Sequence, residues 1–174
     1  NFVQPWPDYM SIAANIQTYA KRGVTGVYQE GQYKAYGGDL QVLKSWLGMK
    51  LMWNASQSTE VLIQKFAVGY YGRTAAPFVL KHIEIFVKSA NTTSLHQGPD
   101  AEYLSPRACL SALANLQRAK SAVKAAAGSD DVDTVDALYR LAAIELGTTY
   151  AVLLRWDEMR AWAAPVKEHS GPAS

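Results

Sequence analysis

Apolar residues recur at spacings of three and four along most of this chain, in segments that each end at a glycine, a proline or a polar stretch. This spacing gathers apolar side chains on one face of an α-helix, whereas a half-buried β-strand needs strict alternation. Hydrophobic residues make up 49% of the 174 residues, which argues against disorder and allows a sizeable core. The sequence therefore predicts a mainly α fold, a bundle of about six helices with at most one or two short strands.

Capping residues and helix breakers divide the chain into these helices. Asp8, Asp39 and Ser58 are each placed to cap a helix, and Ser105 does so immediately before a proline at the first helical position. Gly72 stops one helix, and another begins near residue 74. The expected helices cover residues 9–21, 40–53, 59–70, 74–90, 106–127 and 131–163.

The last expected helix opens at Asp130 or Asp131 and carries an apolar stripe with an uninterrupted pattern of four-residue and three-residue steps. We expect this stripe to face inward, as the seam of an antiparallel helix pair. Its members are Val135, Tyr139, Ala142, Leu146, Thr149, Leu153 and Trp156. The polar stretch 91–103 is the expected boundary between a unit over residues 1–90 and a helical pair over 104–164, with a frayed tail over 165–174.

Charge and motif content exclude several classes of protein. The formal net charge is +2, with no basic run, so we expect no nucleic-acid partner. No apolar stretch approaches the roughly 20 residues that span a bilayer. The three histidines lie far apart in the sequence, and no nucleotide-binding or hydrolase motif is present, so we expect no metal and no cofactor. The single cysteine, Cys109, is expected to be a buried small hydrophobe.

One stretch has the composition of a binding site. Residues 24–28 are short and β-branched and form the one convincing strand pattern. The loop after a strand's carboxyl end is where α/β folds bind ligands. A carboxylate, an amide and tyrosines suit a saccharide, because the acid and amide bind hydroxyls and aromatic rings stack on sugar faces. The candidate saccharide-binding residues are Tyr28, Gln29, Glu30, Tyr33 and Tyr36.

Glu30 is the one candidate for a catalytic residue, although catalysis, ligand binding and a solvated structural role all remain open for it. Glycosidic acid–base chemistry needs a second carboxylate, and none in this chain is evidently placed to pair with Glu30. The triplets that begin at Asn54 and Asn91 match the N-glycosylation pattern and fall in expected turns between helices. They favour a secretory or extracellular location in a eukaryotic host.

Four stretches within residues 1–90 together resemble a domain of unknown function found in large carbohydrate-active proteins. In that family an entry Pro-x-Pro leads to a helix, a glycine-rich strand and loop, a further helix and a Gly-Tyr-Tyr-Gly turn. The corresponding stretches here are Pro5-Trp6-Pro7-Asp8, Gly23 to Gly31, Asp39 to Asn54, and Gly69-Tyr70-Tyr71-Gly72. The family is similar to the (β/α)₈-barrel glycoside hydrolases, with some likeness to the α-glucuronidase group.

The resemblance implies that residues 1–90 are the end of a barrel, that Val24–Tyr28 is one of its last strands, and that the helices behind them extend it. It also implies that Gln29 and Glu30 lie near the substrate face, without assigning Glu30 a catalytic role. Because one strand alone leaves both edges unpaired, we expect Val24–Tyr28 to be non-strand, or paired with another chain, when the segment stands by itself.

Two functions remain open. In the first, the chain is the C-terminal segment of a glycoside-hydrolase-like protein, lining a cleft for an oligosaccharide or polysaccharide and inactive alone. Its partners are then the sugar and the remainder of the parent protein. In the second, the chain is a non-catalytic helical scaffold or protein-interaction module, because over half of it is amphipathic helix without a polar constellation.

Overall fold

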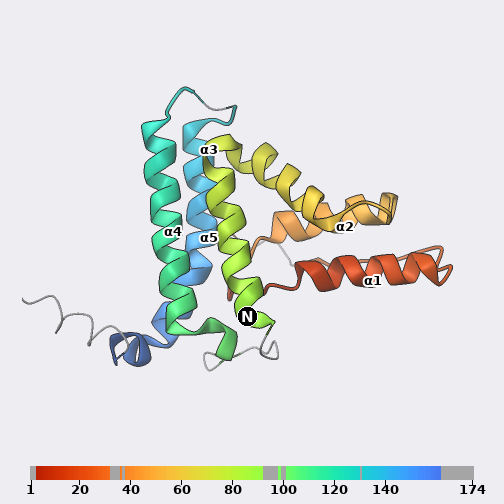
Figure 1. Cartoon of the computed structure of the whole chain (residues 1–174), viewed down its shortest axis with the longest axis horizontal. Coiled ribbons are helices and arrows are strands. Elements are labelled where there is room, and N and C mark those ends of the chain that lie inside the picture. The colour runs from red at the N-terminus through yellow and green to blue at the C-terminus, as the bar shows by residue number, and fades with distance from the viewer. Residues whose placement is uncertain are drawn as a thin grey trace, which may run out of the picture.

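The computed structural model describes residues 3–31, 36, 38–91, 98, 101–129 and 131–161, and within these ranges every regular element is a helix (Figure 1). The second half of α3 runs beside α4 and α5 in a three-helix bundle, while α1 and α2 project from its side (Figure 1). The helices are α1 (Tyr9–Lys21), α2 (Gln41–Trp53), α3 (Thr59–Ala90), the short 3₁₀ helix η1 (Glu102–Leu104), α4 (Pro106–Ala125) and α5 (Thr134–Leu154). The expectation of a helical bundle is confirmed.

The predicted helix boundaries hold at three places where the local chemistry is unambiguous. The Ser58 hydroxyl accepts from the Val61 amide at 3.3 Å, and the Ser105 hydroxyl accepts from the Ala108 amide at 3.3 Å. Gly72 has φ 84° and ψ 161°, so α3 consists of two helical halves joined at a break. Only glycine adopts such a conformation without strain, which is why the helix turns at this residue.

Two hydrophobic cores stabilise the fold, and both combine residues from α3 with residues that follow it in the sequence, from position 101 onward. The larger core joins α1, α2 and the first half of α3 to α4 and α5, with Leu47, Leu116 and Leu141 fully buried. The smaller core lies at the other end of the bundle around Phe86 and Tyr103. The expected boundary at residues 91–103 therefore lies between segments that share both cores. The division of the chain into two units stays a prediction.

Asp39 has a different role from the one expected. It does not cap α2, because Leu40 precedes that helix with φ 46°, in the left-handed region. The buried Asp39 carboxylate instead accepts from the Trp6 amide at 2.7 Å and from the Tyr9 hydroxyl at 3.1 Å. Lys44 Nζ lies 3.3 Å from the same carboxylate. This cluster ties the entry segment to the starts of α1 and α2.

Two further caps differ from expectation. Asp8 precedes α1 but makes no capping hydrogen bond, because its carboxylate lies 2.9 Å from Lys44 Nζ. α5 is capped by Asp133, whose carboxylate accepts from the amides of Val135 and Asp136 at 2.8 and 3.2 Å. The α5 start therefore lies after both Asp130 and Asp131, and Asp130 itself lies outside the described residues.

The prediction for the buried face of α5 was wrong. The stripe expected to form the inner seam faces outward, with Val135 73% exposed, Tyr139 61% exposed and Leu153 63% exposed. The buried residues of α5 are Ala137, Leu141, Ile144, Gly147, Thr148, Ala151 and Val152. The helix is long and apolar enough to cross a membrane by length and composition alone. In this fold, however, its inner face packs against α3 and α4.

The segment after α1 is extended but pairs with no strand among the described residues. Residues 24–30 are exposed and without regular structure, and the Val24 amide donates back to the carbonyl of Tyr19 at 3.0 Å. The expectation that Val24–Tyr28 is non-strand in the chain by itself is confirmed. The expectation that Cys109 is a buried small hydrophobe is confirmed, because its side chain is fully buried. Burial raises the pKa of its thiol to about 12.

We expect His82 to make folding sensitive to acid. It is buried beside Phe86, and its Nδ1 has no hydrogen-bond partner within the described part of the chain. Burial lowers its pKa from 6.5 to about 4, against a smaller opposing effect of Asp39. Between those two values the unfolded chain binds a proton that the folded chain does not, so stability falls as pH falls. We expect a loss of up to about 3 kcal/mol across this window.

Urea unfolding at a series of pH values measures this effect. The control is His82→Leu, which keeps an apolar side chain in the site and cannot titrate. The free energy of unfolding of the wild type should fall more steeply than that of the variant between pH 6.5 and 4. Parallel curves would show that His82 is not responsible.

The Asp39 cluster should dominate the stability of the α1–α2 arm. Asp39→Ala removes the acceptor for the Trp6 amide and the Tyr9 hydroxyl and leaves a half-buried Lys44 with one fewer partner. We expect a loss of about 2–4 kcal/mol in urea unfolding. Asp157→Ala, at an exposed position, is the matched control and should change the value by less than about 0.5 kcal/mol. Equal effects of the two variants would contradict this assignment.

Candidate functional site

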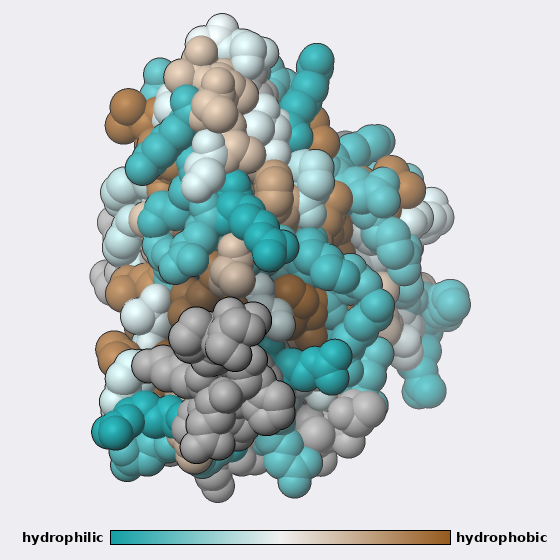
Figure 2. Space-filling view, turned by 60° about the vertical axis from the view of Figure 1, so that its left-hand side comes forward, coloured by the Kyte–Doolittle hydropathy of each residue, from teal (hydrophilic) through white to brown (hydrophobic). Residues whose placement is uncertain are grey.

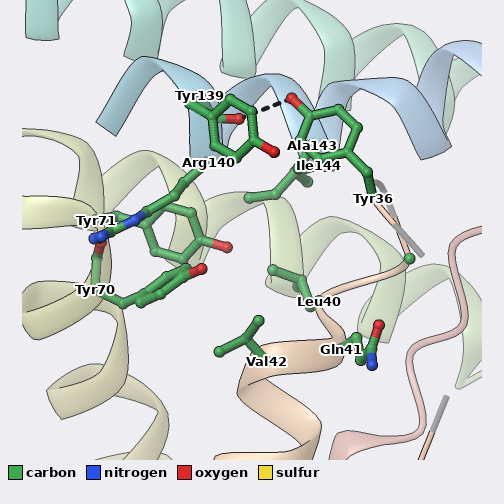
Figure 3. A pocket seen from close by; sticks show the side chains of 11 residues that line it. Tyr36, Leu40, Gln41, Val42, Tyr70, Tyr71, Tyr139, Arg140, Ala143 and Ile144 are labelled. Atoms are coloured by element: carbon green, nitrogen blue, oxygen red, sulfur yellow. Dashed lines mark hydrogen bonds between the residues drawn. The ribbon is translucent and has the colours of Figure 1, made fainter. Parts of the chain in front are cut away.

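A tyrosine-lined hollow of about 130 Å³ lies where the start of α2, the break in α3 and the outer side of α5 meet (Figure 3). Its aromatic wall comes from four tyrosines in three parts of the chain, namely Tyr36, Tyr70, Tyr71 and Tyr139. Leu40, Val42 and Ile144 form its apolar floor. Among the described residues, the hollow is open to solvent on one side.

The break at Gly72 positions the two central tyrosines. Tyr70 and Tyr71 end the first half of α3, and their rings lie 5.0 Å apart at an interplanar angle of 87°. In Figure 3 both hydroxyls point toward the space between α3, α5 and the start of α2. Burial raises the pKa of Tyr71, with a smaller effect from Tyr70, so the Tyr71 hydroxyl is protonated at neutral pH. It can therefore donate a hydrogen bond to a ligand.

Arg140 joins α5 to the broken end of α3. Its guanidinium lies 4.2 Å from the centre of the Tyr70 ring and donates a hydrogen bond to the Tyr70 carbonyl. A second nitrogen contacts the Asp136 carboxylate at 3.2 Å. Carbonyls in the last turn of a helix lack helical partners, so a cation here satisfies one of them and stacks on the neighbouring ring. Arg140 thus fixes one wall of the hollow and brings a positive charge to it.

Tyr36 closes the hollow from the opposite side. Its hydroxyl donates to the Tyr139 carbonyl at 3.2 Å, and the two rings lie 4.8 Å apart (Figure 3). Partial burial raises the pKa of Tyr36, with Tyr139 as the second cause. Both rings remain substantially exposed, at 49% for Tyr36 and 61% for Tyr139. They offer accessible aromatic faces at the rim of the hollow.

The remaining residues predicted from the sequence lie along α2 and outside this hollow. The Gln29 side chain rests on Gly48, where an added Cβ would lie 2.0 Å from the Gln29 Oε1 atom, and Gly31 lies beside Ser45. The extended segment therefore runs antiparallel to α2, toward the end where the hollow is. Tyr28 and Glu30 are exposed on this segment, and Tyr28 is 88% exposed. Tyr33 lies outside the described residues.

A second hollow, of about 280 Å³, lies between α1, the end of α2 and the extended segment. Its lining is mainly apolar and includes Val24, Val27, Tyr19 and Met52. Its lining has no charged side chain in the part of the chain that the structure describes, whereas the first hollow has Arg140 and several hydroxyls. The first hollow is therefore the better candidate for a polar ligand.

The described residues hold no group of three or more His, Cys, Asp or Glu side chains that could bind a metal ion. Glu30 lies outside the hollow, and none of the described residues that line the hollow is acidic. The two asparagines of the possible glycosylation sites are exposed, Asn54 after α2 and Asn91 after α3. Their modification stays a prediction.

A comparison with known protein families gives a match for the N-terminal part of the chain. Residues 1–84 match the family model of DUF4838, a domain of unknown function. This confirms the resemblance to a domain of unknown function. The matched residues include Tyr36, Tyr70 and Tyr71, whereas Tyr139 and Arg140 follow the match. No curated protein and no solved structure gives a significant match.

Sequence reasoning named Tyr36 as a candidate but not Tyr70 or Tyr71, and it assigned Tyr139 to the inner seam of the last helix pair. Tyr71 lines the hollow and is also part of the larger core, at 4% exposed. Each of these residues falls at a helical spacing that is more often buried than ligand-binding. The glycine directly after the tyrosine pair was the available signal, because a helix that breaks there exposes its last turn.

Loss of the Arg140 guanidinium should loosen the wall of the hollow. Arg140→Met keeps an unbranched aliphatic stem at this position. It removes the cation over the Tyr70 ring and the hydrogen bond to the Tyr70 carbonyl. We expect urea unfolding to show a loss of about 1–3 kcal/mol. Arg73→Met, at a side chain that is 80% exposed, is the matched control and should cost less than about 1 kcal/mol. A larger loss for Arg73→Met would contradict the role of Arg140.

Proposed function

We propose that this chain is a saccharide-binding helical segment of a larger, glycoside-hydrolase-like carbohydrate-active protein, and that it is not catalytic alone. The tyrosine-lined hollow is the observation that carries this proposal. It combines two exposed ring faces at the rim with hydroxyls and a guanidinium at the wall, all within one small depression. Three of the four tyrosines lie within residues 1–84, the part of the chain that matches a domain of unknown function.

The chemistry of the hollow suits a neutral polyol better than an apolar ligand or a phosphate. Tyr36 and Tyr139 can stack on the apolar face of a sugar ring, and the Tyr71 hydroxyl can donate to a ring hydroxyl. A phosphate would need several donors in a cluster, but the Arg140 guanidinium already contacts the Tyr70 carbonyl and Asp136. The small volume suits the end of a glycan chain, not a long internal stretch of one.

Binding without hydrolysis is the activity that the lining supports. Glycoside hydrolysis uses two carboxyl groups on either side of the scissile bond. None of the described residues in the lining is acidic, and Glu30 is exposed on the neighbouring extended segment. In this proposal any catalytic carboxylates belong to the remainder of the parent protein, and the exposed Asn54 and Asn91 are consistent with an extracellular or secretory location.

A glycan array probed with the full chain, followed by calorimetric titration of the best ligand, tests the proposal. Tyr139→Ala removes one exposed ring face of the hollow and should weaken binding by about 10-fold or more, since a stacking aromatic contact contributes about 1.4 kcal/mol or more with its buried area. The circular dichroism spectrum should be unchanged, because the side chain is mostly exposed.

Two matched variants locate the binding surface. Glu30→Gln and Tyr28→Ala alter the exposed extended segment and should leave affinity within about twofold if the hollow alone binds the sugar. Loss of binding in these variants but not in Tyr139→Ala would move the site to the extended segment. An array without any bound glycan would remove the saccharide proposal.

The alternative function is a helical scaffold that docks on the remainder of the parent protein. Its specific support is the exposed apolar surface of the α1–α2 arm, where Met49 is 59% exposed and Trp53 is 90% exposed. The exposed, unpaired segment 24–30 lies on the same arm. Stronger binding of the isolated upstream part of the parent protein than of any glycan would favour this alternative.

A further inference from the structure

The turn that follows α2 presents an asparagine carboxamide and a serine hydroxyl together on the surface. Asn54 and Ser56 are both exposed, and they stand at the first and third positions of the Asn-x-Ser acceptor pattern. The Ser56 hydroxyl donates to Asn54 Oδ1 at 2.7 Å, and the Ser56 amide donates to the same oxygen at 3.0 Å. The turn therefore holds in contact the two side chains that N-glycosylation requires.

The two hydrogen bonds reach the oxygen of the carboxamide and leave its nitrogen open. In the described part of the chain, Asn54 Nδ2 donates to no group. Donors at the oxygen stabilise the negative charge that develops there as the nitrogen loses a proton. The turn therefore favours Asn54 Nδ2 as a nucleophile.

We propose that Asn54 is an N-glycosylation site when the chain passes through a eukaryotic secretory compartment, and that it is modified in preference to Asn91. In the transfer, Asn54 Nδ2 forms a bond to C1 of the first sugar of a polyisoprenyl-diphosphate-linked oligosaccharide. The bond between C1 and the diphosphate oxygen breaks, and the polyisoprenyl diphosphate leaves with that electron pair. The proton from the nitrogen passes to a base of the oligosaccharyl transferase. This inference rests on the secretory or extracellular location in the proposed function, and it is independent of the tyrosine-lined hollow.

The backbone distinguishes Asn54 from Asn91. Asn54 follows α2 with φ −148° and ψ 100°, an extended conformation of the kind that enzymes and binding domains recognise in peptides. Asn91 has φ −64° and ψ −17°, and its amide donates to the Val87 carbonyl at 3.1 Å, so it continues the helical geometry of α3. An extended peptide at Asn91 would require the end of this 32-residue helix to unwind.

The turn at Asn54 is built from local contacts, so it can form before the tertiary fold is complete. Besides the two bonds from Ser56, the Gln57 side-chain amide donates to the carbonyls of Lys50 and Asn54 at 3.0 and 3.3 Å. Side chain-to-backbone bonds of this kind stabilise a turn without long-range packing. The acceptor geometry is therefore available to a transferase that acts on a chain still folding.

The folded surface has room for a glycan at this position. A hollow of about 460 Å³ lies between Ser56 and the last turns of α1, where Gln17 and Lys21 line it. Trp53, directly before Asn54, is 90% exposed, and its ring offers an apolar face on which a sugar can stack. A glycan on Asn54 therefore fits without a change in the fold, and we expect it to shield Trp53.

The shielding concerns the most apolar end of the α1–α2 arm. Met49, Met52 and Trp53 are 59%, 40% and 90% exposed near the end of α2. The α4 side of the bundle, which Figure 2 brings forward, is instead mainly hydrophilic, with separate hydrophobic areas. A glycan at Asn54 would give the end of the arm a hydrophilic cover. It would also compete with any partner that docks on Trp53.

Translation of the full chain with microsomes tests the acceptor directly. The chain carries a fused signal peptide, and a C-terminal Asn-Gly-Thr tag reports its entry into the microsomes. Enzymatic release of the glycan in heavy-oxygen water labels each modified asparagine, and peptide mass spectrometry assigns its position. Asn54 should be occupied in chains whose tag is modified, and Asn91 should be occupied less often. An unmodified Asn54 beside a modified tag would overturn the assignment, and higher occupancy at Asn91 would overturn the preference.

Three variants separate the turn from the bare acceptor pattern. Ser56→Ala should lower occupancy at Asn54 at least about 10-fold, because it removes the hydroxyl. Gln57→Ala keeps the acceptor triplet but removes the bonds to the two carbonyls, and it should lower occupancy about twofold or more. Asn91→Gln is the control and should leave occupancy at Asn54 unchanged. Equal occupancy in the wild type and Gln57→Ala would contradict the role of the turn.

Hydroxyl-radical footprinting of the glycosylated and enzymatically deglycosylated chains tests the cover of Trp53. Oxidation of Trp53 should be at least about twofold slower in the glycosylated chain, since a stacked sugar shields one face of the ring. Trp156, which is 52% exposed and follows α5, is the internal control and should be oxidised at the same rate in both. Equal oxidation of Trp53 in both forms would contradict the cover. A glycan array without any bound glycan would remove the saccharide proposal and leave these outcomes untouched.

Discussion

The carboxylate of Asp39 holds the entry segment against the starts of α1 and α2, and this segment contacts both cores. Its hydrogen bond from the Trp6 amide fixes residues 4–7. The Tyr103 hydroxyl, in the other core, donates to the Pro5 carbonyl at 2.8 Å and accepts from Gln4 at 2.7 Å. The entry segment is thus held from two sides by buried polar groups. Because an unpaired buried charge would cost several kcal/mol, this arrangement disfavours any position of the α1–α2 arm that separates Asp39 from Lys44.

The break at Gly72 has a similar importance for the hollow. Tyr70 and Tyr71 directly precede this break. The break ends a helix beside α5, where Arg140 can reach the Tyr70 carbonyl and cover the ring. The same residue therefore separates the arm from the bundle and makes the wall of the candidate site. A single backbone conformation explains both features, which is why the Gly-Tyr-Tyr-Gly sequence matters in this fold.

The sequence predicted the helices and the places where they break, because capping and glycine conformations are local properties. Ser58, Ser105 and Gly72 act as expected. The sequence did not predict which face of α5 is buried, because both faces of this helix are apolar. The stripe with Leu146 follows the bundle period as well as the stripe with Leu141 does, and only packing against α3 and α4 chooses between them. Asp39 failed as a cap for a similar reason, since its partners at Trp6 and Tyr9 lie about 30 residues away along the chain.

The candidate site could be predicted only in part, because its walls meet through contacts between distant residues. Tyr36 and Tyr139 are 103 positions apart, and no local pattern joins them.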